Sequence, residues 1–197
     1  MCTVAIIVLH EIYGINRHII KVCEEYSKYG IDIIAPNLLA GREPFSYDQE
    51  EIAYSYFMNT IGFERSFSQV KDILFNVRAN YQEVYVLGYS IGATLAWLCS
   101  ETGLCDLTIG FYGSRIRDYL LIKPKCPSLL FFPTTEKSFN VEKLILSLNE
   151  FENVQVKKMP GQHGFADPFS NNYNKRSSSR ACVATRLFIK KHETVSA

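Results

Sequence analysis

A single serine stands between two glycines where a β-rich segment changes into a helical one. The segment VYVLGYSIGATLAW places Ser90 between Gly88 and Gly92. Serine and glycine are ordinary turn residues, but a GxSxG motif between a strand and a helix is typical of a nucleophile elbow, which exposes a serine hydroxyl at the carboxyl edge of a sheet. The strained turn brings neighbouring backbone so close that side chains at the two glycine positions would clash. The motif therefore predicts that Ser90 is a nucleophile.

A serine hydroxyl is a poor nucleophile at neutral pH, so this hypothesis requires a histidine base that a carboxylate orients. In an elbow of this kind the acid and the histidine follow the serine, each in a loop after a later strand. We expect His18 and His192 to lie on exposed helix faces, and His10 precedes the serine. His163, in the segment MPGQHGFADP, follows the last predicted strand and is the predicted base.

Two carboxylates compete for the role of the acid. Glu136 is the one carboxylate near the end of the predicted strand PSLLFFP, and it lies between the serine and the histidine in the sequence. Asp167 is the alternative, but it follows His163 by only four residues and would have to fold back toward it. We therefore expect Glu136 to be the acid, with Asp167 as the second candidate.

The elements that must position these residues alternate along the chain. Short apolar segments predict strands, and segments with helical periodicity predict helices between them. Strands alternating with helices imply right-handed βαβ units, and hence an α/β fold with a mostly parallel sheet covered on both faces. We expect strands at 3–9, 31–36, 83–88, 106–113, 127–133 and 154–159, and helices at 18–29, 48–59, 64–81, 91–100, 141–150 and 178–191.

The composition argues against several classes of protein. The net charge is +1 and basic residues are dispersed, so we expect no nucleic-acid partner. No apolar segment is long enough to span a bilayer, and the start MCTVAIIVLH lacks the features of a signal peptide. The cysteines show no CxxC spacing, which argues against a zinc site and fits a reduced cytoplasmic protein. They are Cys2, Cys23, Cys99, Cys105, Cys126 and Cys182.

Five segments together resemble the dienelactone hydrolase family of α/β-hydrolases, in the same order and at similar spacing. The resemblance covers most of the chain and implies one α/β-hydrolase domain over residues 1–197, with a triad at Ser90, Glu136 and His163. No metal or organic cofactor is needed for such a reaction. The segments are VLHEIYGIN (8–16), APNLL (35–39), GYSIGATLAW (88–97), GFYG (110–113) and PGQHGF (160–165).

The resemblance also assigns residues around the triad. It places Glu11 in a loop beside the nucleophile and forms an oxyanion hole from the backbone amides of Ile12 and Ile91, each donor contributing about 3 to 4 kcal/mol of transition-state stabilisation. It further implies a substrate pocket lined by Tyr13, Tyr54 and Phe57.

The chain departs from the family at the reacting residues. The dienelactone hydrolases proper use a cysteine nucleophile and an aspartate acid, whereas this chain has Ser90 and Glu136. Without a thiol to activate, Glu11 is left as a structural hydrogen-bond acceptor. Family members that cleave dienelactone hold its carboxylate with two arginines, and the matching positions here are Glu50 and Asp167. We therefore expect a neutral or cationic acyl substrate instead of dienelactone.

A fourth departure concerns the start of the sheet. Only nine residues precede the HEIYG loop, so we expect the sheet to lack the N-terminal antiparallel strands that usually open an α/β-hydrolase sheet. We expect a compact sheet of about six strands, with 3–9 as an inner strand. Its exposed edge could be covered by dimerisation, so a monomer or a homodimer is expected.

These observations predict a cytoplasmic serine hydrolase that acts on a small ester, lactone or thioester, without a nucleic-acid or membrane partner. Two alternatives remain open. One is a catalytically silent member of the fold that binds a small molecule, and the other is a small peptidase with the same triad.

Overall fold

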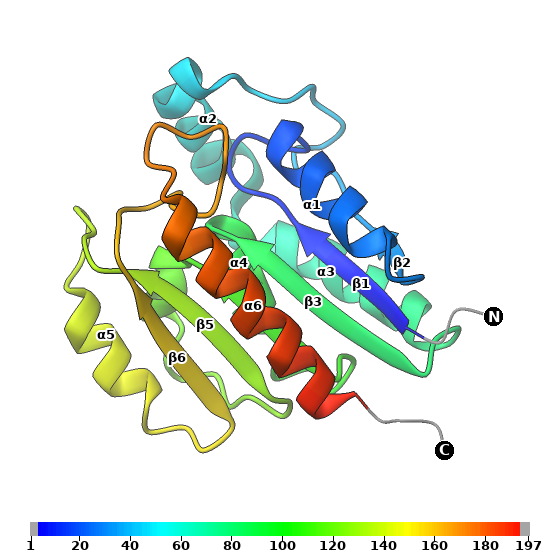
Figure 1. The fold of residues 1–197 in the computed structure, drawn as a ribbon. Helices are drawn as coiled ribbons and strands as arrows, with labels where there is room; N and C mark the ends of the chain where they lie inside the picture. The colour runs from blue at the N-terminus through cyan, green and yellow to red at the C-terminus, as the bar shows by residue number, and fades with distance from the viewer. Residues whose placement is uncertain (1–3, 194–197) are drawn as a thin grey trace.

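The computed structural model describes residues 4–193 and contains a sheet of six parallel strands (Figure 1). Their order is β2-β1-β3-β4-β5-β6, and every neighbouring pair is parallel. The predictions of an α/β fold, of about six strands and of an inner first strand are confirmed. The strands are β1 (Val4–Leu9), β2 (Asp32–Ile34), β3 (Glu83–Tyr89), β4 (Leu107–Phe111), β5 (Ser128–Pro133) and β6 (Val154–Met159).

Helices cover both faces of the sheet (Figure 1). The side chains of β1 show how the faces differ: Ile6 and Val8 pack with α1 (Arg17–Ser27) and α6 (Lys175–His192), whereas Ile7 packs with α3 (Gly62–Arg78) and α4 (Ile91–Cys99). Helix α5 (Val141–Leu148) packs against β5 on the same face as α4. Successive side chains of a strand point to opposite faces, so a strand between two helical layers must be apolar throughout.

The segment from residue 47 to residue 78 is more continuous than the predicted pair of helices. A short 3-10 turn (Tyr47–Gln49) leads into α2 (Glu50–Tyr56), and a π-helical turn (Phe57–Ile61) joins α2 to α3. Gly62 ends the π turn with a φ of 75°, a conformation that glycine adopts without steric cost. A second 3-10 turn, Ser114–Asp118, follows β4.

Helix α1 corrects one prediction. His18, predicted to lie on an exposed helix face, is buried with 2% of its surface exposed, whereas Ile20 is 49% exposed. The apolar stripe of α1 contains Ile19, Val22 and Tyr26. His18 lies four residues before Val22, so helical periodicity places it on the buried face.

The sequence also led to predictions about membrane spans and about the cysteines. None of the helices within residues 4–193 is long and apolar enough to cross a membrane. Cys2 lies outside the described residues, and the other five cysteines are free thiols. Of these five, Cys182 is exposed and Cys23 is half-buried.

Candidate active site

Ser90 occupies the turn between β3 and α4, at the carboxyl end of a central strand. Its φ of 54° and ψ of −112° are unfavourable for a residue with a side chain, at a cost of about 1–3 kcal/mol. The Ser90 amide donates to the carbonyl of Phe111 at 2.9 Å, and the Ser90 carbonyl accepts from the amide of Thr94 at 3.2 Å. These bonds hold the serine in the conformation expected of a nucleophile elbow.

The two flanking glycines allow close contacts between backbone segments. A Cβ at position 88 would lie 2.0 Å from the carbonyl oxygen of Gly92, and a Cβ at position 92 would lie 2.2 Å from that of Leu9. Both neighbours are backbone atoms and cannot rotate away. The steric reason predicted for Gly88 and Gly92 is therefore present in the structure.

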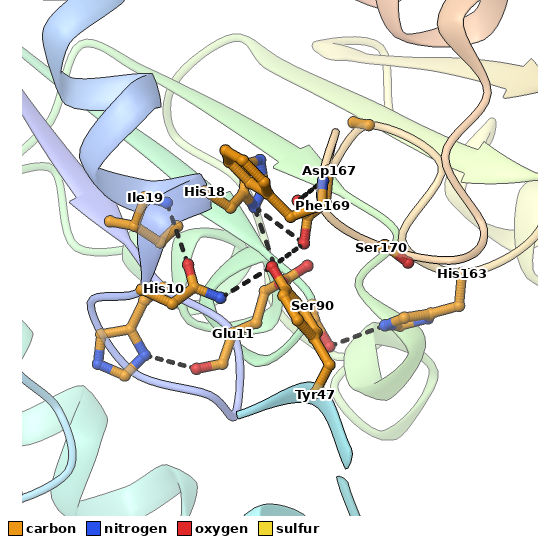
Figure 2. A network of polar contacts seen from close by, with 12 residues as sticks. His10, Glu11, His18, Ile19, Tyr47, Ser90, His163, Asp167, Phe169 and Ser170 are labelled. Carbon is orange, nitrogen blue, oxygen red and sulfur yellow. Dashed lines mark hydrogen bonds and ion pairs between the residues drawn. The ribbon is translucent and has the colours of Figure 1, made fainter. Parts of the chain in front are cut away.

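Three side chains form a hydrogen-bonded chain at this turn. His163, in the loop after β6, approaches the Ser90 Oγ with its Nε2 at 2.9 Å (Figure 2). Its Nδ1 lies 2.7 Å from Oε1 of Glu136, which follows β5. A carboxylate at Nδ1 keeps the proton on that nitrogen, so Nε2 is free to accept the serine proton.

The electrostatics of His163 reflect two opposing effects. Burial disfavours the charged imidazolium, but the hydrogen bond and charge of Glu136, together with the charges of Glu11 and Glu50, outweigh it and raise the pKa of His163 above its ordinary value. The Glu136 side chain is only 6% exposed, so water screens this interaction weakly.

Asp167, the second candidate for the acid, interacts with other groups. Its Oδ2 accepts a hydrogen bond from the Tyr47 hydroxyl at 2.5 Å, and its Oδ1 accepts one from the Phe169 amide at 2.8 Å. The same Oδ2 lies 3.8 Å from Nδ1 of His18. The structure thus brings Glu136, and not Asp167, to the imidazole of His163.

The amides of Ile12 and Ile91 are available as hydrogen-bond donors. The Ile91 amide is the first of α4, and such amides have no partner within the helix. Ile12 lies in the loop after β1, where the Gly14 amide donates to the Glu11 carbonyl. Within residues 4–193, the hydrogen bonds found leave both amides without an acceptor, as an oxyanion hole requires.

His10 anchors the loop that carries Ile12. The Leu38 amide donates to its Nε2 at 2.9 Å, so the ring proton is on Nδ1, which donates to the Glu11 carbonyl at 2.6 Å. Complete burial lowers the pKa of His10 to about 4, so the ring is neutral. His10 is therefore a structural residue in the loop that carries Ile12.

The residues predicted to line the pocket fall into different environments. Tyr13 is half-buried against Tyr47, with ring centroids 4.8 Å apart. Tyr54 is 44% exposed, and its hydroxyl accepts a hydrogen bond from Arg115 at 2.7 Å. Phe57 is fully buried in the hydrophobic core, so the structure places it beneath the site and not in a pocket wall.

The predicted acidic positions also differ in exposure. Glu50 is exposed at the start of α2, whereas Glu11 and Asp167 are buried at 4% and 1% exposure. Burial raises the pKa of Tyr13 far above its ordinary value, and the charges of these three carboxylates raise it further. Tyr13 therefore lies in negatively charged surroundings.

His18 is a site residue that the sequence reasoning missed. Its Nδ1 lies 3.8 Å from Oε2 of Glu11 and 3.8 Å from Oδ2 of Asp167 (Figure 2). Burial works against the charge of Glu11, but the interaction with His18 outweighs it and lowers the pKa of this carboxyl. The signal available in the sequence was the position of His18 on the apolar stripe of α1.

The parallel sheet, the elbow at Ser90 and the loops converging on it define an α/β hydrolase. The chain belongs to the dienelactone hydrolase family, whose sequence model matches residues 2–193.

A curated relative is the uncharacterized protein YczH of Bacillus subtilis strain 168, 36% identical over 173 residues that cover 86% of this chain and 84% of YczH. Two solved structures share the fold at 15% identity. One is a putative dienelactone hydrolase from Klebsiella pneumoniae, with a TM-score of 0.80 over 96% of this chain and 87% of that one. The other is P91, a dienelactone hydrolase-like promiscuous phosphotriesterase from metagenomic libraries, with a TM-score of 0.77 over 97% and 87%.

Proposed function

We propose that the protein is a serine hydrolase that cleaves a small carboxylic ester, lactone or thioester through an acyl-enzyme. The observation that carries this proposal is the chain of hydrogen bonds from Ser90 through His163 to Glu136. A general base within hydrogen-bond reach of a serine, itself oriented by a carboxylate, is the arrangement that activates a hydroxyl.

The reaction then follows from the positions of these atoms. Ser90 Oγ attacks the carbonyl carbon while His163 Nε2 takes the hydroxyl proton, and the amides of Ile12 and Ile91 donate to the oxyanion. His163 gives this proton to the departing alkoxide or thiolate, which leaves as an alcohol or a thiol as the acyl-enzyme forms. A water molecule then gives its proton to His163 and attacks the acyl carbon, which releases the acid and restores the serine. Glu136 stabilises the imidazolium in both steps.

The charges near the site support a neutral or cationic acyl group. Glu50 and Asp167 occupy the positions where dienelactone-cleaving relatives are expected to carry arginine, and Glu11 adds a third carboxylate. An anionic lactone would be repelled at such a site. We expect no turnover of a carboxylate-bearing dienelactone, and measurable cleavage of one would contradict this part of the proposal.

Two alternatives make different predictions. A catalytically silent binding protein would have no need for the strained serine or for the hydrogen-bonded His163. A small peptidase would use the same residues, and the difference would appear as turnover of short peptides, whose amide bonds are harder to cleave than esters.

The decisive experiment is intact-mass analysis after exposure to a fluorophosphonate probe, which phosphonylates only activated serines. We expect one adduct, mapped to Ser90, that is absent in Ser90→Ala and His163→Ala. Circular dichroism of both variants controls for folding. Absence of an adduct in the folded wild-type protein would favour the silent binding protein, whereas an adduct would lead to a screen of uncharged esters, lactones, thioesters and peptides.

A further inference from the structure

Three side chains from separate parts of the chain meet behind Ser90 (Figure 2). Glu11 comes from the loop after β1, His18 from the first turn of α1 and Asp167 from the loop after β6. Their exposed fractions are 4%, 2% and 1%. One nitrogen and two carboxylate oxygens lie within 4.8 Å of one another, which is a donor set that can hold a metal ion.

The Nδ1 atom of His18 forms no direct hydrogen bond with the two carboxylates. His18 Nδ1 lies 3.8 Å from each carboxylate oxygen, which is too long for a hydrogen bond. This nitrogen is buried and has no hydrogen-bond partner. A buried polar atom without a partner costs about 1–3 kcal/mol. The three groups therefore surround a common point without bonding to each other.

A second buried polar group lies at the same place. The Tyr112 hydroxyl is also buried without a hydrogen-bond partner, and Tyr112 is fully buried with an unfavourable φ of 46°. Burial and then the charge of Glu11 raise the pKa of this hydroxyl well above its ordinary value. Tyr112 is thus a further buried polar side chain that interacts with Glu11.

The charge of the cluster is also incomplete. Within residues 4–193, His18 is the one basic side chain that forms an ion pair with Glu11 or Asp167. The nearby Arg17 lies over the ring of Phe169, 4.5 Å from its centroid, instead of pairing with the cluster. Two buried carboxylates and one imidazole would be neutralised by a divalent cation.

We propose that Glu11, His18 and Asp167 bind a divalent transition-metal ion, with Zn²⁺ as the preferred metal. Tetrahedral coordination with bonds of about 2.1 Å requires ligand atoms roughly 3.4 Å apart. The two distances of 3.8 Å to His18 need a few tenths of an ångström of closure, and all three ligand atoms lie within 4.8 Å of one another. A water molecule or the Tyr112 hydroxyl completes the coordination. The imidazole ligand disfavours Mg²⁺ and Ca²⁺, which take oxygen ligands.

The surroundings of the cluster have the features of a supported metal site. Asp167 is oriented by hydrogen bonds from Tyr47 and from the Phe169 amide, and Asn16 donates in turn to the Tyr47 hydroxyl at 3.1 Å. Such outer partners fix the orientation of metal ligands. His18 also lines a surface groove of about 170 Å³ between α1 and α6.

The ion would connect the segments that carry the proposed reaction. Glu11 is adjacent to Ile12, whose amide is assigned to the oxyanion hole, and Asp167 is four residues after His163. The metal would therefore position these groups. It would also neutralise Glu11 and Asp167, which leaves Glu50 as the charge that disfavours an anionic acyl group. The binding proposal itself does not depend on the hydrolase proposal, because metal can be measured without turnover.

The test uses the full-length protein, stripped with a chelator and titrated with Co²⁺ as a spectroscopic probe and with Zn²⁺ by calorimetry. We expect one equivalent of each, the visible absorption bands of four- or five-coordinate Co²⁺, and a higher thermal midpoint in the presence of Zn²⁺. His18→Gln and Asp167→Asn should weaken binding by roughly 100-fold or more, because losing a ligand costs at least as much as losing an outer partner.

The control addresses the other histidine and carboxylate pair in the protein. The triad itself could hold Zn²⁺ through His163 and Glu136, so His163→Ala must keep its affinity if the ion occupies the cluster at His18. Loss of binding in His163→Ala with retention in His18→Gln would overturn the proposal. So would the absence of Co²⁺ bands in the wild-type protein, a result that does not depend on any variant folding.

Discussion

Replacing Glu136 by glutamine tests which carboxylate orients His163. Glutamine has nearly the same shape as glutamate, but it removes the charge that lies 2.7 Å from Nδ1. Its amide can also present an N–H to the ring and select the tautomer that cannot accept the serine proton. In a triad, the corresponding loss of the acid lowers turnover by about 10⁴-fold, or about 5 kcal/mol of transition-state stabilisation. We expect kcat/KM of Glu136→Gln to fall by roughly 10³ to 10⁴-fold.

The pH profile gives a second and independent readout. Activity requires neutral His163, so kcat/KM is lost as the pH falls through the pKa of this imidazole. Glu136 helps to raise that pKa, and removing its charge should move the acidic limb of the profile to lower pH. The profile is measured with a small p-nitrophenyl ester, on protein whose folding is checked by circular dichroism.

The matched variant is Asp167→Asn, which makes the same chemical change at the other candidate. Asp167 does not contact His163, so we expect the acidic limb to stay in place and the loss of kcat/KM to be well below that of Glu136→Gln. The reasoning would be refuted if Asp167→Asn shifted the limb and cost as much activity as the change at Glu136.

Three further predictions follow from the geometry around the site. Gly92→Ala should destabilise the protein by about 3 kcal/mol or more in urea unfolding, because its Cβ would lie 2.2 Å from a backbone oxygen. Gly30 has open space around it and a φ of 71°, so Gly30→Ala should cost only about 1–2 kcal/mol. Equal losses of stability in the two variants would contradict the steric argument. Phe57→Ala should cost about 3–5 kcal/mol of stability, as expected of a core residue. Tyr54→Ala should change KM with little effect on the free energy of unfolding. The reverse pattern would show that Phe57 lines the substrate pocket. Glu50→Gln should move the acidic limb of the kcat/KM profile to lower pH by a small amount, since the charge of this exposed carboxylate raises the pKa of His163 only weakly. A shift to higher pH would contradict this effect of Glu50 on His163.

Features that depend on neighbouring residues could be predicted from the sequence. The apolar segments that form β1 and β3 are buried on both faces, and their composition shows it. The elbow is equally local, because Gly88, Ser90 and Gly92 lie on one turn whose steric demands exclude larger side chains. Chain order then limited the base to His163, the one histidine in a loop after the last strand.

Long-range contacts decided the rest. His163 meets Ser90 across 73 residues and Glu136 across 27, and only the folded loops show that Asp167 turns away to Tyr47. The burial of Phe57 depends on how the π turn packs against Phe63, with ring centroids 5.2 Å apart.

The cluster of Glu11, His18 and Asp167 shows most clearly which features the local sequence predicts and which depend on long-range contacts. Periodicity alone placed His18 on the apolar face of α1, but it could not show that two carboxylates face it from other segments. A parallel sheet gathers the carboxyl ends of its strands at one edge, so the loops after β1 and β6 approach α1 only when the sheet is assembled. The local sequence thus determined which elements form and where the serine turns, and the tertiary structure decided which charged groups meet, because loop conformation and strand order set those distances.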